Sequence, residues 1–179
     1  MIWKYKNYRG VKIFYSFEEM KTFIRLLEKN RIKYRIHAGY GLEGLRGKIS
    51  REHWDLDLLS LKKYEKKLEK IIEEEGYEIH KHRNLLKIMR NRIKIIDIGL
   101  LVKEGDKYVS YGAIAETRFP SKLFKPQKGH IGNFKFNIAS NELLKLWGST
   151  SKYINDRKLI KNLEVDTKLY KKIRRKLYA

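Results

Sequence analysis

Two aspartates at alternate positions, Asp55 and Asp57, offer the clearest chemistry in the chain. They lie in an apolar stretch with Leu56 and Leu58, and alternate side chains of a β-strand share a face. The two carboxylates would therefore point the same way, about 7 Å apart along the strand, while the leucines enter the core. Carboxylate oxygens placed in this way can converge on a divalent cation. The pattern predicts a metal site on this strand.

The segment before the aspartates has the composition of a phosphate-binding turn. An apolar strand ending at Ile36 runs into Ala38–Gly39, and glycines recur at positions 41, 44 and 47. Glycine leaves backbone N–H groups accessible to a phosphate, and a helix that begins there would add its positive end. Three nearby cations could neutralise the charge of a triphosphate: Arg46, Lys48 and Arg51. Residues 36–59 thus indicate a phosphate site beside a metal pair.

This stretch resembles the polymerase-β-type nucleotidyltransferases, and within them the small enzymes that adenylylate aminoglycoside and lincosamide antibiotics. The small-Gly turn, the Thr/Ser-Arg-x-His run and the Asp-x-Asp of that family are matched in order by Ala38–Gly39, Ser50–His53 and Asp55–Asp57. The family's acidic residue and Gly-Lys pair fit Glu43 and Gly47–Lys48. Ala38 stands where the family has glycine, and alanine is small enough to keep the turn tight.

A third acid, Asp97, lies in the middle of an apolar run, residues 92–102, that predicts a strand. Burying a bare carboxylate is costly, so an aspartate in this position needs a reason. The resemblance implies one, because the third carboxylate of the family lies on a later strand next to the Asp-x-Asp. The alternative, an outward-facing aspartate, stays open.

The resemblance also implies a reaction. Asp55, Asp57 and Asp97 would bind two Mg²⁺ ions, and Asp97 could double as the general base on the acceptor hydroxyl. Backbone amides of Ala38–Gly39 would hold the phosphates, with Arg51 the best-matched cation. An NMP would move from an NTP, with ATP the expected donor, to a hydroxyl with release of pyrophosphate. His53 could orient the first aspartate or only pack, and Glu43 could be structural or lie on the acceptor side.

The charge of the chain bears on its partners. Lys and Arg number 42 against 21 acids, a net charge of +21. Such a field concentrates polyanions, although lysine-rich proteomes also give basic proteins with no nucleic-acid role. Beside the NTP, we expect an acceptor that is either a small hydroxylated molecule or RNA. No apolar run reaches the ~20 residues of a membrane helix, and no signal peptide or cysteine is present, so we expect a cytoplasmic protein without a membrane partner.

The elements that must position these residues predict an α/β (α+β) fold, with a mixed sheet, helices packed on one face and a small helical C-terminal part. Ser16 and Glu19 form a capping box for a helix to about Asn30, and Ser60 can cap a second helix over 61–75 that Gly76 ends. Alternating patterns predict further strands at 77–82, 85–90, 107–112 and 132–138, and residues 1–15 also favour β structure. Ser140 can cap a later helix, and an amphipathic basic helix closes the chain.

We expect a single domain over 1–179, with 140–179 as a basic helical extension. A rival interpretation is a non-catalytic RNA-binding or toxin–antitoxin-type module on the same fold. Three acids placed as a metal triad argue against this rival, because a pure binding module has no need of them.

Overall fold

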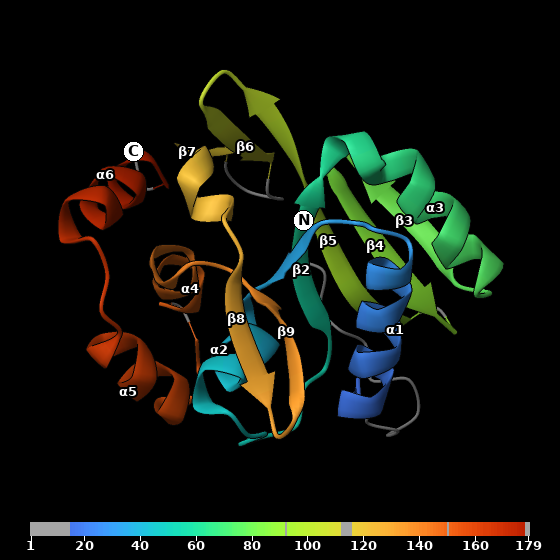
Figure 1. Cartoon of the computed structure of the whole chain (residues 1–179), viewed down its shortest axis with the longest axis horizontal. Coiled ribbons are helices and arrows are strands. Elements are labelled where there is room, and N and C mark those ends of the chain that lie inside the picture. Colours follow the sequence, from blue (N-terminus) through green and yellow to red (C-terminus); the bar gives the residue numbers. More distant parts are fainter. Residues whose placement is uncertain (1–14, 92, 112–115, 150, 178–179) are drawn as a thin grey trace.

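The computed structural model describes residues 15–91, 93–111, 116–149 and 151–177, and a mixed sheet forms its centre (Figure 1). The main strands lie in the order β3-β4-β5-β2-β1-β9-β8. Within it, β2 pairs with β5 and β1 with β9 in parallel, while the other neighbours are antiparallel. The strand bounds are β1 Tyr34–Ile36, β2 Leu56–Leu61, β3 Glu78–His82, β4 Leu85–Arg90, β5 Ile93–Glu104, β6 Lys107–Tyr111, β7 Glu116–Pro120, β8 Gln127–Ile131 and β9 Phe134–Ile138.

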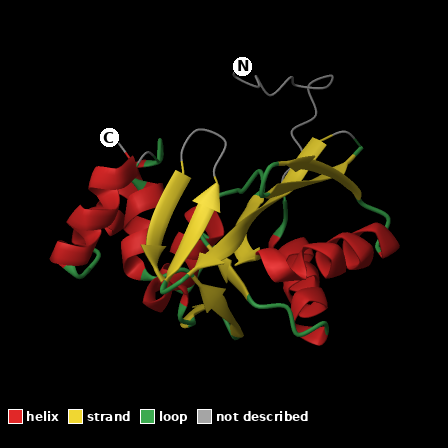
Figure 2. Ribbon diagram, turned by 90° about the horizontal axis from the view of Figure 1, so that it is seen from above, coloured by secondary structure: helices red, strands yellow, loops and turns green. Residues whose placement is uncertain are grey.

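The helices flank this sheet. Figures 1 and 2 show α1 and α3 on the same face of the sheet, and α4, α5 and α6 gathered at the side of the molecule opposite α3. Their bounds are α1 Phe17–Lys29, α2 Ala38–Arg46, α3 Glu65–Glu74, α4 Asn141–Gly148, α5 Ile154–Asn162 and α6 Thr167–Leu177. In the part of the chain that the structure describes, no helix has both the length and the apolar character needed to cross a membrane. The mixed sheet with helices confirms the predicted fold class.

Helix α1 forms where the capping box predicts it. The Ser16 side chain accepts a hydrogen bond from the Glu19 N–H, and the Glu19 carboxylate accepts one from the Ser16 N–H. The apolar face of the helix is buried against the sheet and consists of Met20, Phe23, Ile24 and Leu27. The β-leaning segment predicted over residues 1–15 lies outside the described residues except for Tyr15.

Helix α2 forms although three of its nine residues are glycines, which are poor helix formers. Two of these glycines have a packing reason. A Cβ on Gly41 would stand 2.7 Å from Leu144 Cδ2, and one on Gly44 would stand 3.0 Å from the Phe136 ring. The glycines therefore let α2 approach α4 and β9 more closely than any larger residue would allow.

The predicted cap at Ser60 is wrong. Strand β2 continues through Leu61, and a 3₁₀ turn at Lys62–Tyr64 precedes α3, which begins only at Glu65. Ser60 is buried in the sheet between β1 and β5, and its Oγ donates a hydrogen bond to the Lys33 carbonyl 2.9 Å away. Strand pairing on both sides thus overrides the local capping signal. The end of the helix at Gly76, where φ is +80°, agrees with the prediction.

Candidate active site

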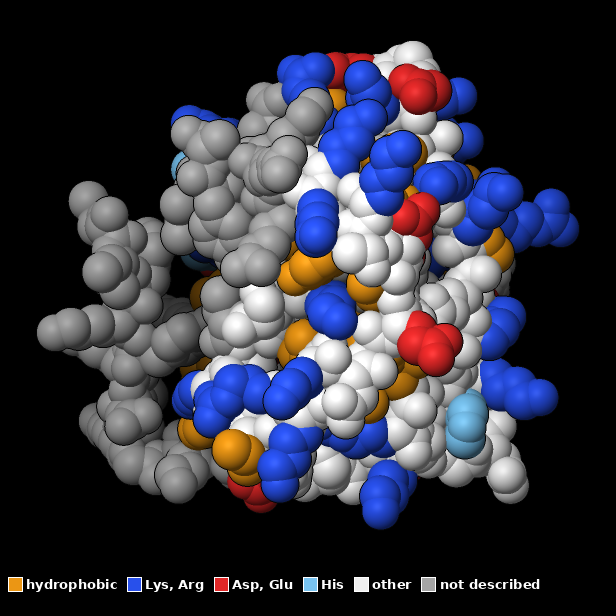
Figure 3. Space-filling view, turned by 90° about the vertical axis from the view of Figure 1, so that its left-hand side faces the viewer, with side chains coloured by type: hydrophobic (Ala, Val, Ile, Leu, Met, Phe, Trp, Pro, Cys, Tyr) orange, Lys and Arg blue, Asp and Glu red, His pale blue; other side chains and the backbone are white. Residues whose placement is uncertain are grey.

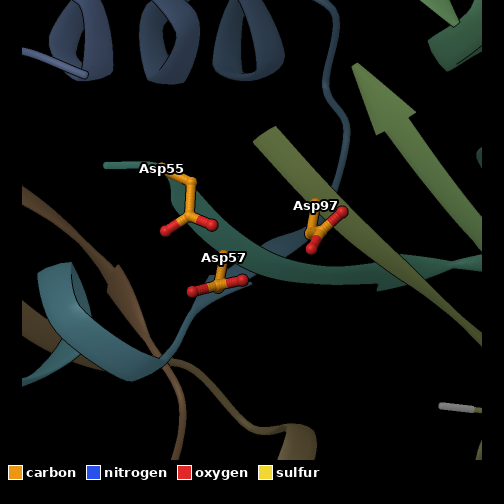
Figure 4. A group of neighbouring side chains, drawn as sticks. All are labelled: Asp55, Asp57 and Asp97. Carbon is orange, nitrogen blue, oxygen red and sulfur yellow. The ribbon is translucent and has the colours of Figure 1, made fainter. Parts of the chain in front are cut away.

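Adjacent parallel strands bring the three aspartates together. Asp57 and Asp97 are register partners in β2 and β5, and Asp55 comes directly before β2. One carboxylate oxygen from each of the three lies within 4.8 Å of the others (Figure 4). Asp97 Oδ1 is buried and has no hydrogen-bond partner, as expected of an oxygen that serves a ligand. Three carboxylates so arranged fit a hard divalent cation such as Mg²⁺.

The charged side chains of the cluster interact strongly with one another. Burial, and then the negative charge of Asp55, raise the pKa of Asp57 to about 8. A cation lies within the cluster, because Lys94 Nζ is 2.7 Å from Asp55 Oδ2 and 2.5 Å from Asp97 Oδ2. Burial alone would lower the pKa of Lys94, but the three aspartates outweigh it and raise that pKa above its ordinary value. Three carboxyl groups and one ammonium group thus share this small volume.

The N-terminus of α2 lies beside the carboxylates. The His37 N–H donates to the Asp57 carbonyl at 3.0 Å, which ties the residue before α2 to strand β2. Ala38 follows with φ +50°, a left-handed conformation that normally favours glycine. The glycine that the resemblance implies at this position would adopt this conformation without strain. The predicted phosphate turn and the predicted metal site therefore adjoin.

His37 itself adds a neutral ring to this junction. Burial lowers the pKa of its imidazole to about 4, against the opposing influence of Asp55. The ring contacts Trp147 of α4 with the centroids 4.9 Å apart, and Nδ1 is buried without a hydrogen-bond partner. Near neutral pH the ring can therefore donate or accept a hydrogen bond without carrying charge.

Arg51 and His53 pack over Gly39, the second residue of α2. A Cβ on Gly39 would stand 2.5 Å from His53 Nδ1 and 2.9 Å from Arg51 Nη2, so only glycine leaves room for both side chains. The Arg51 guanidinium lies 3.9 Å from the centre of the Tyr153 ring and 3.3 Å from Asp156 Oδ2. These contacts hold the positively charged guanidinium of Arg51 at the start of α2.

Glu43, which the sequence left as either structural or acceptor-side, organises the loop that carries Arg51. Its buried carboxylate accepts hydrogen bonds from Ser50 Oγ at 2.8 Å and from the Ser50 N–H at 3.2 Å, and lies 3.2 Å from His53 Nε2. Burial raises the pKa of Glu43, but the bonds from His53 and Ser50 and the charge of Arg46 outweigh it and lower the pKa. Glu43 and His53 thus fix the loop on α2.

Of the other two predicted phosphate ligands, Arg46 shares the Asp156 carboxylate with Arg51, and Lys48 lies apart. Arg46 pairs with Asp156 at 2.8 Å and with Glu43 at 3.3 Å, so its charge is already matched by buried acids. Lys48 is exposed and follows Gly47, the residue that ends α2. A nine-residue helix is about 13 Å long, so Lys48 lies at the opposite end of α2 from Ala38. The structure therefore gathers Asp55, Asp57, Asp97, Ala38, Gly39 and Arg51, but not Lys48.

Four residues of this neighbourhood escaped the sequence analysis. Lys94, His37 and Tyr153 carry no recognisable motif, and their places depend on tertiary packing. Asp156 left a weak signal, because it is one of only three acids among residues 150–179. One of few acids in a basic segment is a candidate for a buried ion pair.

Comparisons with known proteins identify the family of the chain. The family profile described as aminoglycoside-2''-adenylyltransferase matches residues 19–142, more than half of the chain. A search of curated proteins gave no significant match. The lincosamide antibiotic adenylyltransferase LnuA, solved with lincomycin bound, has a similar structure with a TM-score of 0.67 and 22% identity, covering 84% of this chain and 98% of LnuA.

A second similar structure is ANT(2'')-Ia in complex with adenylyl-2''-tobramycin. It has a TM-score of 0.63 and 17% identity, over 89% of this chain and 99% of that one. These structural matches establish the nucleotidyltransferase fold, and the profile match establishes the family. The chain belongs to the aminoglycoside-2''-adenylyltransferase family and is an enzyme of the nucleotidyltransferase type.

Proposed function

We propose that the protein transfers AMP from ATP to a hydroxyl of a small acceptor and releases pyrophosphate, with Mg²⁺ held by Asp55, Asp57 and Asp97. The observation that carries this proposal is the meeting of three carboxylates within 4.8 Å, beside the N-terminus of α2. Two bound Mg²⁺ ions would polarise the phosphates and acidify the acceptor hydroxyl. The family to which the chain belongs supports this type of reaction.

The nucleotide would bind across the start of α2. Backbone N–H groups at Ala38–Gly39 and the positive end of the helix can receive phosphate oxygens. Arg51 is held beside Gly39, and its Nε is buried without a hydrogen-bond partner, so it has a donor to offer. A guanidinium matches phosphate oxygens in charge and geometry. These residues orient the triphosphate next to the aspartates.

The acceptor hydroxyl would be activated by Asp97. Its Oδ1 is buried and has no hydrogen-bond partner, while Oδ2 is held by Lys94. An acceptor hydroxyl that reached Oδ1 could therefore give its proton to this carboxylate as the oxygen attacks the phosphate. The charge of Asp55 acts on the pKa of the His37 ring, so this neutral ring is a further polar group near the cluster.

Charge narrows the class of acceptor. LnuA was solved with lincomycin and ANT(2'')-Ia with an adenylylated tobramycin, so both proteins handle small hydroxylated antibiotics. This chain has a net charge of +21, and Figure 3 shows basic side chains spread over the side that carries α5 and α6. Such a field opposes a polycationic aminoglycoside and favours a neutral or anionic acceptor. RNA would also be attracted, and therefore forms one arm of the test.

We also propose that residues 140–179 work as part of the same domain as the catalytic sheet. Helix α4 packs on α2 through the close contact of Leu144 with Gly41. Asp156 of α5 pairs with both Arg46 and Arg51, which belong to α2 and to the loop after it. The extension thus reaches into the proposed nucleotide site.

The test is a transfer assay with ATP, GTP, CTP and UTP, each labelled at the α-phosphate, in the presence of Mg²⁺. The acceptor arms are a small-metabolite pool, a lincosamide, an aminoglycoside and total RNA, and Asp57→Asn is the control enzyme. We expect label from ATP in a small neutral or anionic molecule, and none with the control. Label in RNA or in the aminoglycoside would overturn the acceptor class, and the absence of transfer in every arm would overturn the reaction.

A further inference from the structure

We infer that Lys94 is a positioning residue that sets how tightly the carboxylate cluster binds divalent cations, because its ammonium occupies the Asp55–Asp97 side of the cluster until a cation displaces it. This inference rests on the proposed metal-dependent function. It assigns a role to a residue that lies outside every motif of the sequence.

A bulge in β5 aims Lys94 at the aspartates. Residues three apart in a regular strand point to opposite faces, so Lys94 and Asp97 should diverge. Between Ile88 and Met89 of β4, however, the partner in β5 changes from Ile96 directly to Lys94. Ile95 is therefore the extra residue, and Lys94 and Asp97 fall on the same face of the sheet. Bulges beside active sites commonly redirect a side chain in this way.

The contacts made by Lys94 overlap with those that a cation would need. Its Nζ lies 2.7 Å from Asp55 Oδ2 and 2.5 Å from Asp97 Oδ2. The lysine side chain is only 16% exposed, and those of the two aspartates are 25% and 22% exposed. Charge-assisted hydrogen bonds of this kind are strong, because little water screens them. A divalent ion that used either oxygen would have to displace the ammonium from it.

The charges of the site point to the same consequence. Three carboxylates with one ammonium leave a smaller negative charge for divalent ions than the carboxylates alone would. Two Mg²⁺ ions would overcompensate that charge in the absence of nucleotide, whereas a bound triphosphate supplies further negative charge. Lys94 would therefore keep the affinity for free ions low and make full metal loading depend on the nucleotide.

A purely structural lysine would behave differently from a competing one. If Lys94 only neutralised repulsion among the aspartates, its removal would lower stability and leave metal affinity as it was. If its ammonium competes with the cation, removal must raise the affinity. Metal affinity measured without any turnover separates the two roles.

The experiment titrates Mn²⁺ into the metal-free full-length protein and follows unbound Mn²⁺ by electron paramagnetic resonance. Lys94→Met and Lys94→Gln should bind Mn²⁺ more tightly than wild type by roughly tenfold or more, while Lys94→Arg should stay near wild type. Lys94→Gln keeps a hydrogen-bond donor and covers the case in which Lys94→Met does not fold. Lys62→Met is the matched control. Lys62 also pairs with an acid, Glu65 at 2.7 Å, but this pair lies away from the aspartate cluster. The Lys62→Met variant should therefore bind Mn²⁺ as wild type does.

The outcomes separate this inference from the proposed function. If wild type and Lys94→Gln bind Mn²⁺ equally at a site that Asp57→Asn abolishes, the metal site stands and the role of Lys94 is refuted. If Asp57→Asn does not weaken Mn²⁺ binding by wild type or by the Lys94 variants, the metal site itself is refuted. The inference about Lys94 is then refuted with it.

Discussion

Asp57 and Asp97 stand directly opposite one another across the parallel strands β2 and β5. Their separation is fixed by backbone hydrogen bonds of the sheet rather than by a loop, so the two carboxylates form a rigid pair. Asp55 joins them from the residue that precedes β2. A site built on strands holds its ligands in place before the metal and nucleotide arrive, which favours catalysis.

Replacement of any one of these aspartates should abolish transfer. Asp55→Ala, Asp57→Ala and Asp97→Ala each remove a proposed cation ligand, and the loss of several kcal/mol of transition-state stabilisation corresponds to a rate loss of about 10³-fold or more. Circular dichroism should show an unchanged fold. Asp106→Asn, in the exposed turn between β5 and β6, is the control and should retain activity. Near wild-type turnover by any of the three alanine variants would contradict the assignment.

The raised pKa of Asp57 makes the stability of the metal-free protein dependent on pH. The folded-state pKa of about 8 lies above the ordinary value of 3.8, so between these values the native carboxyl holds a proton that the unfolded chain has lost. Unfolding then releases a proton, and the free energy of unfolding contributed by this group falls as pH rises. Urea unfolding in EDTA from pH 5 to 8 should therefore show a steeper fall for wild type than for Asp57→Asn. Parallel curves for the two proteins would refute the shift.

The start of α2 offers a pair of substitutions with opposite expected effects. Gly39→Ala would place a Cβ 2.5 Å from His53 Nδ1, so we expect a loss of stability of about 1–3 kcal/mol and weaker ATP binding. Ala38→Gly should raise stability by about 1 kcal/mol, because it relieves a left-handed residue with φ +50°. Urea unfolding measures the change in stability of both variants. A stable, ATP-binding Gly39→Ala variant would show that the packing of Arg51 and His53 on this helix is not needed.

Asp156 should matter for nucleotide binding although it lies in the C-terminal extension. Its side chain is 2% exposed and pairs with Arg46 and Arg51. Asp156→Asn therefore leaves Arg51 without its acid and Arg46 with Glu43 alone, and should cost about 3 kcal/mol of stability. Arg51 should also lose its position, and KM for ATP should rise about tenfold while kcat changes less. Glu164→Gln, an exposed acid of the same extension, should change neither. An unchanged KM for Asp156→Asn would remove Asp156 from the site.

Local sequence signals account for much of the fold. The capping box at Ser16 and the helix-ending Gly76 act within a few residues, and the structure confirms both. The spacing of Asp55 and Asp57 likewise has a local meaning that strand geometry makes readable. The apolar run around Asp97 predicts its strand, the resemblance implies that this strand lies next to Asp55 and Asp57, and the structure pairs it with β2.

The remaining features depend on contacts between distant residues. Ser60 has the chemistry of a helix cap, yet pairing of β2 with both neighbours keeps it in a strand. The direction of the Lys94 side chain depends on a bulge in β5 opposite β4, and no sequence pattern within 93–104 predicts this bulge. The sequence analysis did not predict strand β8 or helix α5. It therefore also missed the pairing of Asp156 in α5 with Arg46, which lies 110 positions earlier. Side-chain pairs of such separation are set by packing and not by local spacing.

Anomalous diffraction from crystals grown with Mn²⁺ and a non-hydrolysable ATP analogue tests the central claim most directly. The account predicts manganese peaks bound by Asp55, Asp57 and Asp97, with the triphosphate at the N-terminus of α2 beside Gly39 and Arg51. Manganese bound elsewhere, or a triphosphate away from α2 with the three aspartates empty, would contradict it.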